Sequence, residues 1–165
     1  MNRQEERAAL ILDRRTRALA ERKDGQGQTQ ALRALIIASV GSNLLGFDVA
    51  EVAAVIPFEG CARMPVSDPA VLGVVGRAGR FYSVIGLARV VTQPAGEAGG
   101  PAPAPAHLLL LRGSAPHMAL AVDRVLGRFD LAGDTTFDLD GQWVALFDPE
   151  SLRRRFGRAS AGGHP

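Results

Sequence analysis

Few side chains in this chain have the type and spacing that catalysis or metal binding requires. The three histidines, His107, His117 and His164, lie too far apart in the sequence to share a helical face or a compact ligand spacing. Cys61 is the only cysteine, so it can form neither an internal disulfide nor a two-thiol metal clip. We therefore expect an inert, buried or half-buried thiol and no metal centre.

Two short motifs are similar to parts of known binding loops. Asp138-Leu139-Asp140-Gly141 is like the opening of a calcium loop, but mostly apolar residues follow where further oxygen ligands are needed, so a polar β-turn is expected. Gly76-Arg77-Ala78-Gly79 is too short for a phosphate loop and lacks its lysine. No serine lies in a Gly-x-Ser-x-Gly elbow. The sequence thus predicts a binding module without a cofactor, and not an enzyme.

A strand, turn, strand pattern occupies residues 71–87. Two short apolar runs, residues 72–75 and 81–85, are rich in β-branched and aromatic residues. Glycines lie in the segment between them, residues 76–80, which predicts a hairpin with a long turn.

Further short apolar runs surround this hairpin, and they predict a mostly β protein. Strand-like runs cover residues 35–40, 44–49, 52–58, 107–111, 118–123, 125–131, 135–139 and 143–147. Residues 5–23 instead have apolar side chains at helical spacing, which predicts an N-terminal helix. Asp148, Pro149 and Glu150 are suited to begin a short C-terminal helix as the N-cap, the first position and the first turn.

Composition restricts the remaining possibilities. The chain has 165 residues, of which 47% are hydrophobic and 22% charged, enough to bury one substantial core or two small ones. No apolar run approaches the roughly 20 residues that span a bilayer, so we expect a soluble, cytoplasmic protein without membrane insertion. The basic residues concentrate near the two ends and the middle is mildly acidic, which argues against a nucleic-acid groove on the body.

The predicted organisation has five parts. Residues 93–106 are rich in Pro, Ala and Gly without a large apolar side chain, which is typical of a linker or loop. The parts are a helical extension (1–27), a first β-barrel (28–92), the linker (93–106), a second β-barrel with the C-terminal helix (107–158) and a tail (159–165).

Several of these segments resemble the chemotaxis coupling proteins with CheW-like domains. Met64-Pro65, Pro69 and the run Val71-Leu-Gly-Val-Val75 resemble the signature of that family, and the segment from Ala119 to Gly127 is similar to a second one. The resemblance covers roughly residues 33–156. It implies two small five-stranded, SH3-like β-barrels on either side of a hydrophobic junction.

The resemblance also implies a function. A coupling protein is a non-catalytic adaptor that binds the regulatory domain of a CheA-type histidine kinase and the cytoplasmic tip of a chemoreceptor, in arrays at the membrane. The positions that the resemblance implies for partner binding are Val52, Ala54, Val55, Ile56, Gly73, Val75, Arg77, Gly79, Arg80, Val122, Asp123 and Val125.

The chain departs from the family pattern at two charged positions. Ala54 and Ala78 stand where the family commonly has Glu and Arg. Arg77 and Arg80 lie close enough to replace the missing guanidinium, although neighbouring strand positions point to opposite faces.

Two other functions remain open. A divergent CheW-like adaptor could have lost kinase or receptor coupling and bind another partner. Alternatively, the Arg-rich ends, Arg14, Arg15, Arg17 and residues 153–155, could bind RNA or an anionic membrane.

Overall fold

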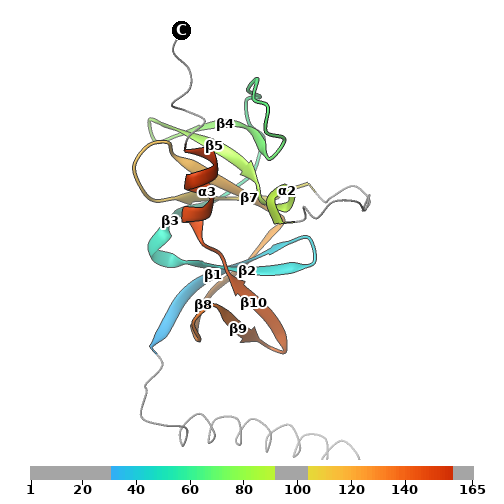
Figure 1. Ribbon diagram of the computed structural model, residues 1–165, viewed down its shortest axis with the longest axis vertical. Helices are drawn as coiled ribbons and strands as arrows, with labels where there is room; N and C mark the ends of the chain where they lie inside the picture. Colours follow the sequence, from blue (N-terminus) through green and yellow to red (C-terminus); the bar gives the residue numbers. More distant parts are fainter. Residues whose placement is uncertain (1–30, 92–103, 158–165) are drawn as a thin grey trace, which may run out of the picture. The chain divides into compact units, whose positions relative to one another are not determined.

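The computed structural model of the protein describes residues 31–91 and 104–157. The strands are β1 (Leu32–Val40), β2 (Asn43–Asp48), β3 (Val52–Pro57), β4 (Val71–Arg77), β5 (Arg80–Gly86), β6 (His107–Leu111), β7 (Met118–Val122), β8 (Arg124–Ala132), β9 (Thr136–Leu139) and β10 (Gln142–Leu146). A 3-10 turn, η1 (Val49–Glu51), and two short helices, α2 (Leu87–Val91) and α3 (Pro149–Phe156), complete the described fold (Figure 1). The predicted N-terminal helix, most of the linker and the tail lie outside the described residues.

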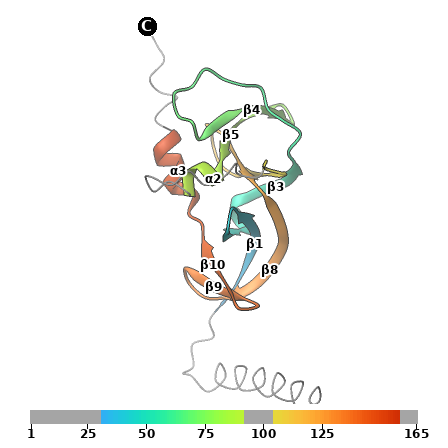
Figure 2. The same ribbon diagram turned by 90° about the vertical axis from the view of Figure 1, so that its right-hand side faces the viewer.

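The strands form two five-stranded sheets, which confirms the predicted fold class. The first, sheet A, has the order β8-β1-β2-β10-β9, and the second, sheet B, has the order β3-β6-β7-β5-β4. Both views place β9 and β10 at one end of the described residues and β4 and β5 at the other (Figures 1 and 2). Neighbouring strands pair antiparallel except at β2 with β10 and β5 with β7, which pair parallel.

The division of the chain between the two sheets differs from the prediction. We expected residues 28–92 to form one barrel and residues 107–158 the other. Instead, sheet B uses the continuous stretch from β3 to β7, and sheet A combines β1 and β2 with β8, β9 and β10. Four strand pairings cause this arrangement, because each joins a strand before the linker to a strand after it: β1–β8, β2–β10, β3–β6 and β5–β7.

The apolar side chains of these strands pack into three clusters. All five strands of sheet A contribute to one cluster, around Phe137 and Val144, and all five strands of sheet B contribute to another, around Tyr82 and Val84. The third and largest cluster takes residues from both sheets and from α3, so it is the junction between the sheets. The clusters confirm the expected hydrophobic junction between two small β units.

Strand β6 shows how the sequence encodes this arrangement. Leu108 and Leu110 belong to the apolar cluster of sheet B, whereas Leu109 and Leu111 belong to the junction cluster on the other face. Both faces of the strand are therefore buried, which is why its sequence is a continuous apolar run rather than an alternating one. Ala106, which we predicted to lie in the linker, already hydrogen-bonds to Phe58 and Val122 and extends this ladder.

Two local features differ from the expected elements. The β4–β5 turn has only two residues, Ala78 and Gly79, both with positive φ (48° and 72°), because residues 76, 77 and 80 continue the strands. Helix α2 is absent from the sequence-based prediction, since five residues are too few to establish a helical period.

The expected helix start at α3 is confirmed. Asp148 is the N-cap and accepts a hydrogen bond from the backbone of Glu150, and Pro149 occupies the first turn.

Candidate interaction surfaces

The structure divides the twelve predicted partner-binding residues by their exposure. Val52, Gly73 and Val122 are buried in the described structure. The half-buried members are Ala54, Ile56, Val75, Asp123 and Val125, and the exposed members are Val55, Arg77, Gly79 and Arg80.

Two of the buried residues belong to the junction, and the third allows a close backbone contact. Val52 and Val122 lie in the cluster between the sheets. Gly73 has a φ of 154°, and a Cβ built on it would lie 2.2 Å from the carbonyl oxygen of Ala62. Val74 pairs with Ala62 through two backbone hydrogen bonds, so Gly73 lets the loop after β3 join the edge of β4. Packing within the fold therefore accounts for all three residues.

Asp123 also has an internal role. Its carboxylate accepts a hydrogen bond of 2.6 Å from the backbone N–H of Gly41, and its own N–H donates to the carbonyl of Ser39. The Asp123 side chain therefore links the connection between β7 and β8 to the β1–β2 turn through a hydrogen bond. Val125, two residues on, packs against the junction cluster.

Three of the predicted residues come together at the end of sheet B. Ile56, Val75 and Arg77 line one hollow of about 410 Å³, together with Pro57, Glu59, Gly60, Gly76 and Leu108. The hollow lies between the end of β3 and the end of β4, beside the β4–β5 turn. Its lining combines the apolar side chains of Ile56, Val75 and Leu108 with one charge of each sign, Glu59 and Arg77.

The β4–β5 hairpin tip carries the charged and aromatic groups nearest to this hollow. Arg77 and Arg80 are direct cross-strand partners, so both leave the same face of the hairpin. Phe81 points to the opposite face and is 75% exposed, with its ring over Gly76. Neither arginine forms an ion pair within the described part of the chain.

The structure clarifies the two departures from the family pattern. Ala54 is half-buried and packs against the interior cluster of sheet B, opposite Leu110, so position 54 faces inward here. Ala78 is exposed at the first turn position. The cross-strand arginines, Arg77 and Arg80, flank that turn and share a face, which places guanidinium groups on both sides of Ala78.

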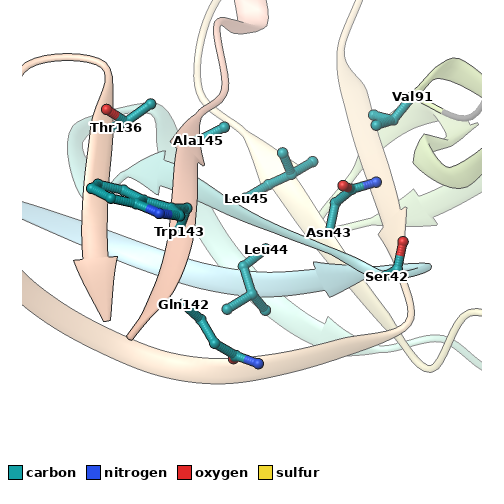
Figure 3. Close-up of a pocket in the computed structure, with 9 residues that line it drawn as sticks. All are labelled: Ser42, Asn43, Leu44, Leu45, Val91, Thr136, Gln142, Trp143 and Ala145. Carbon is teal, nitrogen blue, oxygen red and sulfur yellow. The ribbon is translucent and has the colours of Figure 1, made fainter. Parts of the chain in front are cut away.

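One exposed surface was not among the predicted sites. Trp143 is 72% exposed and lines a hollow of about 500 Å³ where β2 and β10 begin (Figure 3). The lining residues are Ser42, Asn43, Leu44, Leu45, Val91, Thr136, Gln142, Trp143 and Ala145, none of them charged. Trp143 and Val91 lie on opposite sides of the hollow, with Leu45 between them (Figure 3). A lone Trp in a strand-like run does not show from sequence which face it occupies.

Helix α3 uses most of its positive charge within the molecule. Arg153 pairs with Glu51 and Glu150 and donates to the carbonyl of Arg112, and Arg155 pairs with Asp68. The hydrogen bond to Glu150 and the further pairing with Glu51 raise the pKa of the Arg153 guanidinium. Two of the three consecutive arginines are thus already paired, which weakens the case for a polyanion-binding end at this helix.

The polar side chains of the described residues do not gather into a metal-binding cluster. No set of three or more His, Cys, Asp or Glu side chains in residues 31–91 and 104–157 is arranged to hold a metal ion. Asp138 instead accepts a hydrogen bond from Gly141 in the β9–β10 turn, as expected for a polar turn. In the same part of the chain, no helix is long and apolar enough to cross a membrane.

Comparisons with known proteins agree with this architecture. The model of the CheW-like domain family matches residues 34–136, which is more than half of the chain. The crystal structure of the scaffolding protein TtCheW from Thermoanaerobacter tengcongensis is similar, with a TM-score of 0.59 over 71% of this chain and 89% of that chain. The identity to that protein is 14%, so the likeness concerns the fold. No curated protein sequence matches the chain.

Proposed function

Because the chain belongs to the CheW-like domain family, we propose that it is a non-catalytic adaptor that couples chemoreceptors to a CheA-type histidine kinase. The family match over residues 34–136 carries this proposal. The two five-stranded sheets around a shared junction support it, because an adaptor of this kind acts through the surfaces that a rigid double unit presents. The protein would work in the cytoplasm, recruited to receptor arrays at the membrane.

We place the kinase contact at the end of sheet B. The hollow lined by Ile56, Val75 and Arg77 offers apolar side chains beside charged ones, and the hairpin tip adds Arg80 and the exposed Phe81. Aromatic side chains and arginines are enriched at protein interfaces. The receptor contact would use the outer face of the edge strand β3, where Val55 is 38% exposed. Both surfaces are small, so array avidity would raise the effective affinity of each contact.

Calorimetric titration with the regulatory domain of each CheA-type kinase from the same genome tests the kinase contact. We expect saturable binding, and we expect the double variant Arg77→Glu with Arg80→Glu to weaken it at least tenfold, since two rim charges reverse sign. Arg154→Glu is the matched control, because Arg154 is exposed, lies on α3 and has no ion pair in the described chain. If none of these domains binds, the proposed kinase coupling is wrong, and the family assignment still stands.

The exposed Ala78 supports a second candidate, an adaptor that has lost kinase or receptor coupling and binds another partner. Where the family commonly has a charged side chain at the hairpin, this chain presents a methyl group. If the wild-type protein binds no kinase domain but Ala78→Arg gains binding, loss of coupling at this position is the better explanation. If Ala78→Arg does not change binding, either Arg77 and Arg80 already supply the charge that the kinase contact needs, or the partner binds another surface. Titration of the wild-type protein with the kinase domains separates these two cases, because only the first predicts binding.

A further inference from the structure

Helix α3 ties the last strand of sheet A to segments of sheet B. Strand β10 belongs to sheet A and leads into the helix, which both views place beside elements of sheet B (Figures 1 and 2). Its arginines contact η1 through Glu51, the β6–β7 turn through the carbonyl of Arg112, and the loop before β4 through Asp68. These segments lead into sheet B or connect its strands, so the helix is a brace between the two sheets.

Only a few side chains hold this brace in place. Pro149, Leu152 and Phe156 are its buried residues, and the last two lie in the junction cluster. Within the described residues, no backbone hydrogen bond joins α3 to a strand, and no strand runs alongside its backbone. A helix of eight residues is not stable by itself in water, so α3 depends on these side-chain contacts for its helical structure.

A hollow of about 320 Å³ lies where α3 meets η1 and the β6–β7 turn. Arg153 lines this hollow and makes the contacts there: it pairs with Glu51 and Glu150, and it donates a hydrogen bond of 2.6 Å to the carbonyl of Arg112. On this side, polar contacts beside a hollow hold the helix, and water can replace such contacts at little cost.

The last turn of α3 is held by a second ion pair. Arg155 lies 3.0 Å from a carboxylate oxygen of Asp68, whose other oxygen accepts a hydrogen bond from the backbone of Ala70. The guanidinium of Arg155 also lies over the ring of Phe156, 5.0 Å from its centre. An ion pair this open to solvent contributes little, so the buried apolar side chains provide most of the docking free energy.

We infer that α3 is a releasable brace, which leaves the junction as one unit and docks again while both sheets stay folded. Elements held by few buried contacts open at a lower free energy than the core of the same protein. In the released state the remaining junction residues and the strand connections still join the sheets. Release uncovers the part of the junction against which Leu152 and Phe156 pack.

This inference is independent of the proposed coupling function. Neither of the two contact surfaces proposed above includes a residue of α3. The tests use the full chain alone, so their outcome does not depend on whether a kinase domain binds.

Amide hydrogen exchange at increasing, non-denaturing urea concentrations tests the release. We expect the amides of residues 153–157 to exchange through a small opening, at rates that depend little on urea. The amides of β6 and β7 should exchange through global unfolding, at rates that rise steeply with urea. Equal protection and equal urea dependence in α3 and these strands would overturn the inference. Exchange of α3 at the rate of an unstructured peptide would also overturn it, because a brace is docked most of the time.

A destabilising substitution away from α3 separates release from global unfolding. Val84 is fully buried in the interior cluster of sheet B, which contains no residue of α3. Val84→Ala should speed exchange in β6 and β7 by about fivefold or more, because it leaves a cavity in the sheet. Exchange in α3 should stay at the wild-type rate, since sheet B is intact in both the docked and the released state. An equal increase in α3 would contradict a separate release.

The paired arginines supply the variant that loosens the brace. We expect Arg153→Gln with Arg155→Gln to speed exchange of residues 153–157 by about threefold or more, because the lost ion pairs exist only in the docked state. Arg154→Gln is the matched control, since Arg154 is exposed and forms no ion pair within the described residues. If the double variant exchanges like this control, the arginines do not hold the helix and this account of the brace is wrong.

A helix-breaking substitution produces the released state directly. Arg154→Pro removes a backbone N–H in the middle of α3 and clashes with the preceding turn. We expect the amide signals of both sheets to keep their dispersion in NMR spectra, and the fluorescence of the apolar dye ANS to rise as the junction is uncovered. Unfolding of the whole chain by Arg154→Pro would overturn the inference, because α3 would then be inseparable from the sheets.

Discussion

Gly73 permits two backbone segments to approach each other more closely than any side chain would allow. Its φ is 154°, and the Ala62 carbonyl oxygen lies 2.2 Å from the position of a Cβ. The neighbouring residue Val74 needs this approach, because it exchanges two hydrogen bonds with Ala62. The glycine of the family-like run from Val71 to Val75 is therefore explained by backbone packing.

We predict that Gly73→Ala destabilises the protein by about 2 kcal/mol or more, from the steric overlap and the strained φ. Gly79→Ala is the matched control. Gly79 also has a positive φ, 72°, but no atom lies within 4 Å of its Cβ position, so we expect a loss of about 1 kcal/mol. Urea unfolding measures both, and equal losses would show that the contact with Ala62 is unimportant.

The ionisation of the Asp48 carboxyl makes the stability of the fold depend on pH. A hydrogen bond from the Arg33 side chain, at 2.7 Å, and one from the backbone of Ala50 hold the pKa of this carboxyl below its usual value. A carboxyl with a lowered pKa in the folded state stabilises the fold above its unfolded pKa. That contribution is lost as the pH falls through the folded pKa.

We therefore expect Asp48→Asn to cost about 0.5 kcal/mol at pH 7, a small value because the pair is open to solvent, and almost nothing near pH 2. Urea unfolding of variant and wild type at both pH values checks this. Asp134→Asn, which removes a carboxylate without an ion pair among the described residues, should differ little from wild type at either pH. A penalty for Asp48→Asn that persists at pH 2 would mean that shape, and not charge, matters there.

At the residue scale, the sequence could identify apolar and turn residues but not the face on which each would lie. Val52 and Val122 were predicted as partner contacts, and they lie in the junction. The reason is that β-strand alternation gives two faces, and both faces of sheet B are partly buried. Trp143 shows the opposite case, an aromatic residue left on the uncovered part of a face.

Helix α3 contributes two buried side chains to the junction. Leu152 is 2% exposed and lies with Phe156 in the cluster between the sheets. Ion pairs from Arg153 and Arg155 connect the helix to Glu51 and Asp68 outside it. The Arg153–Glu51 pair is half-buried and the Arg155–Asp68 pair is open to solvent, and such pairs contribute little individually, so apolar packing holds most of the helix in place.

We predict that Leu152→Ala costs about 3 kcal/mol, because it leaves a cavity in the junction, whereas Arg154→Ala on the exposed side changes stability by less than about 0.5 kcal/mol. Thermal or urea unfolding compares the two. A small loss for Leu152→Ala would show that the junction collapses around the missing methyl groups or that α3 is dispensable.

Elements with strong local signals were predictable from the sequence. The strands on either side of the linker, the Asp140-Gly141 turn and the capped start of α3 all occur where they were expected. The predicted length of the β4–β5 turn was wrong. Gly76 and Arg77 lack a strand-like sequence pattern, and they continue β4 because they pair with Phe81 and Arg80. Short helices such as α2 form because tertiary contacts hold them, in this case Leu87 in the junction.

The pairing of distant strands could not be predicted at the scale of the whole molecule. Local patterns predict strands but do not say which ones are neighbours, and the parallel pairs β2–β10 and β5–β7 join residues far apart in sequence. The assumption that each half of the chain forms its own barrel was therefore the weakest step. Sheet A is completed from both ends of the described chain.

This topology predicts how fragments behave. Residues 28–92 and residues 107–158 should each be unfolded alone, because both sheets would then lack strands. Circular dichroism and amide dispersion in NMR spectra of the separate and mixed fragments check this expectation. Native-like spectra from either fragment alone would contradict the observed strand order.

The order in which the strands are connected also affects how the chain folds during synthesis. Of the described strands, the ribosome releases β1 and β2 first, but β10, the partner of β2, emerges only after more than ninety further residues have been made. Sheet B can close as soon as β7 has left the exit tunnel, whereas the hairpin of β1 and β2 must wait with its apolar faces uncovered. We therefore expect the β1–β2 hairpin to be the part of the nascent chain that needs protection from aggregation for the longest time.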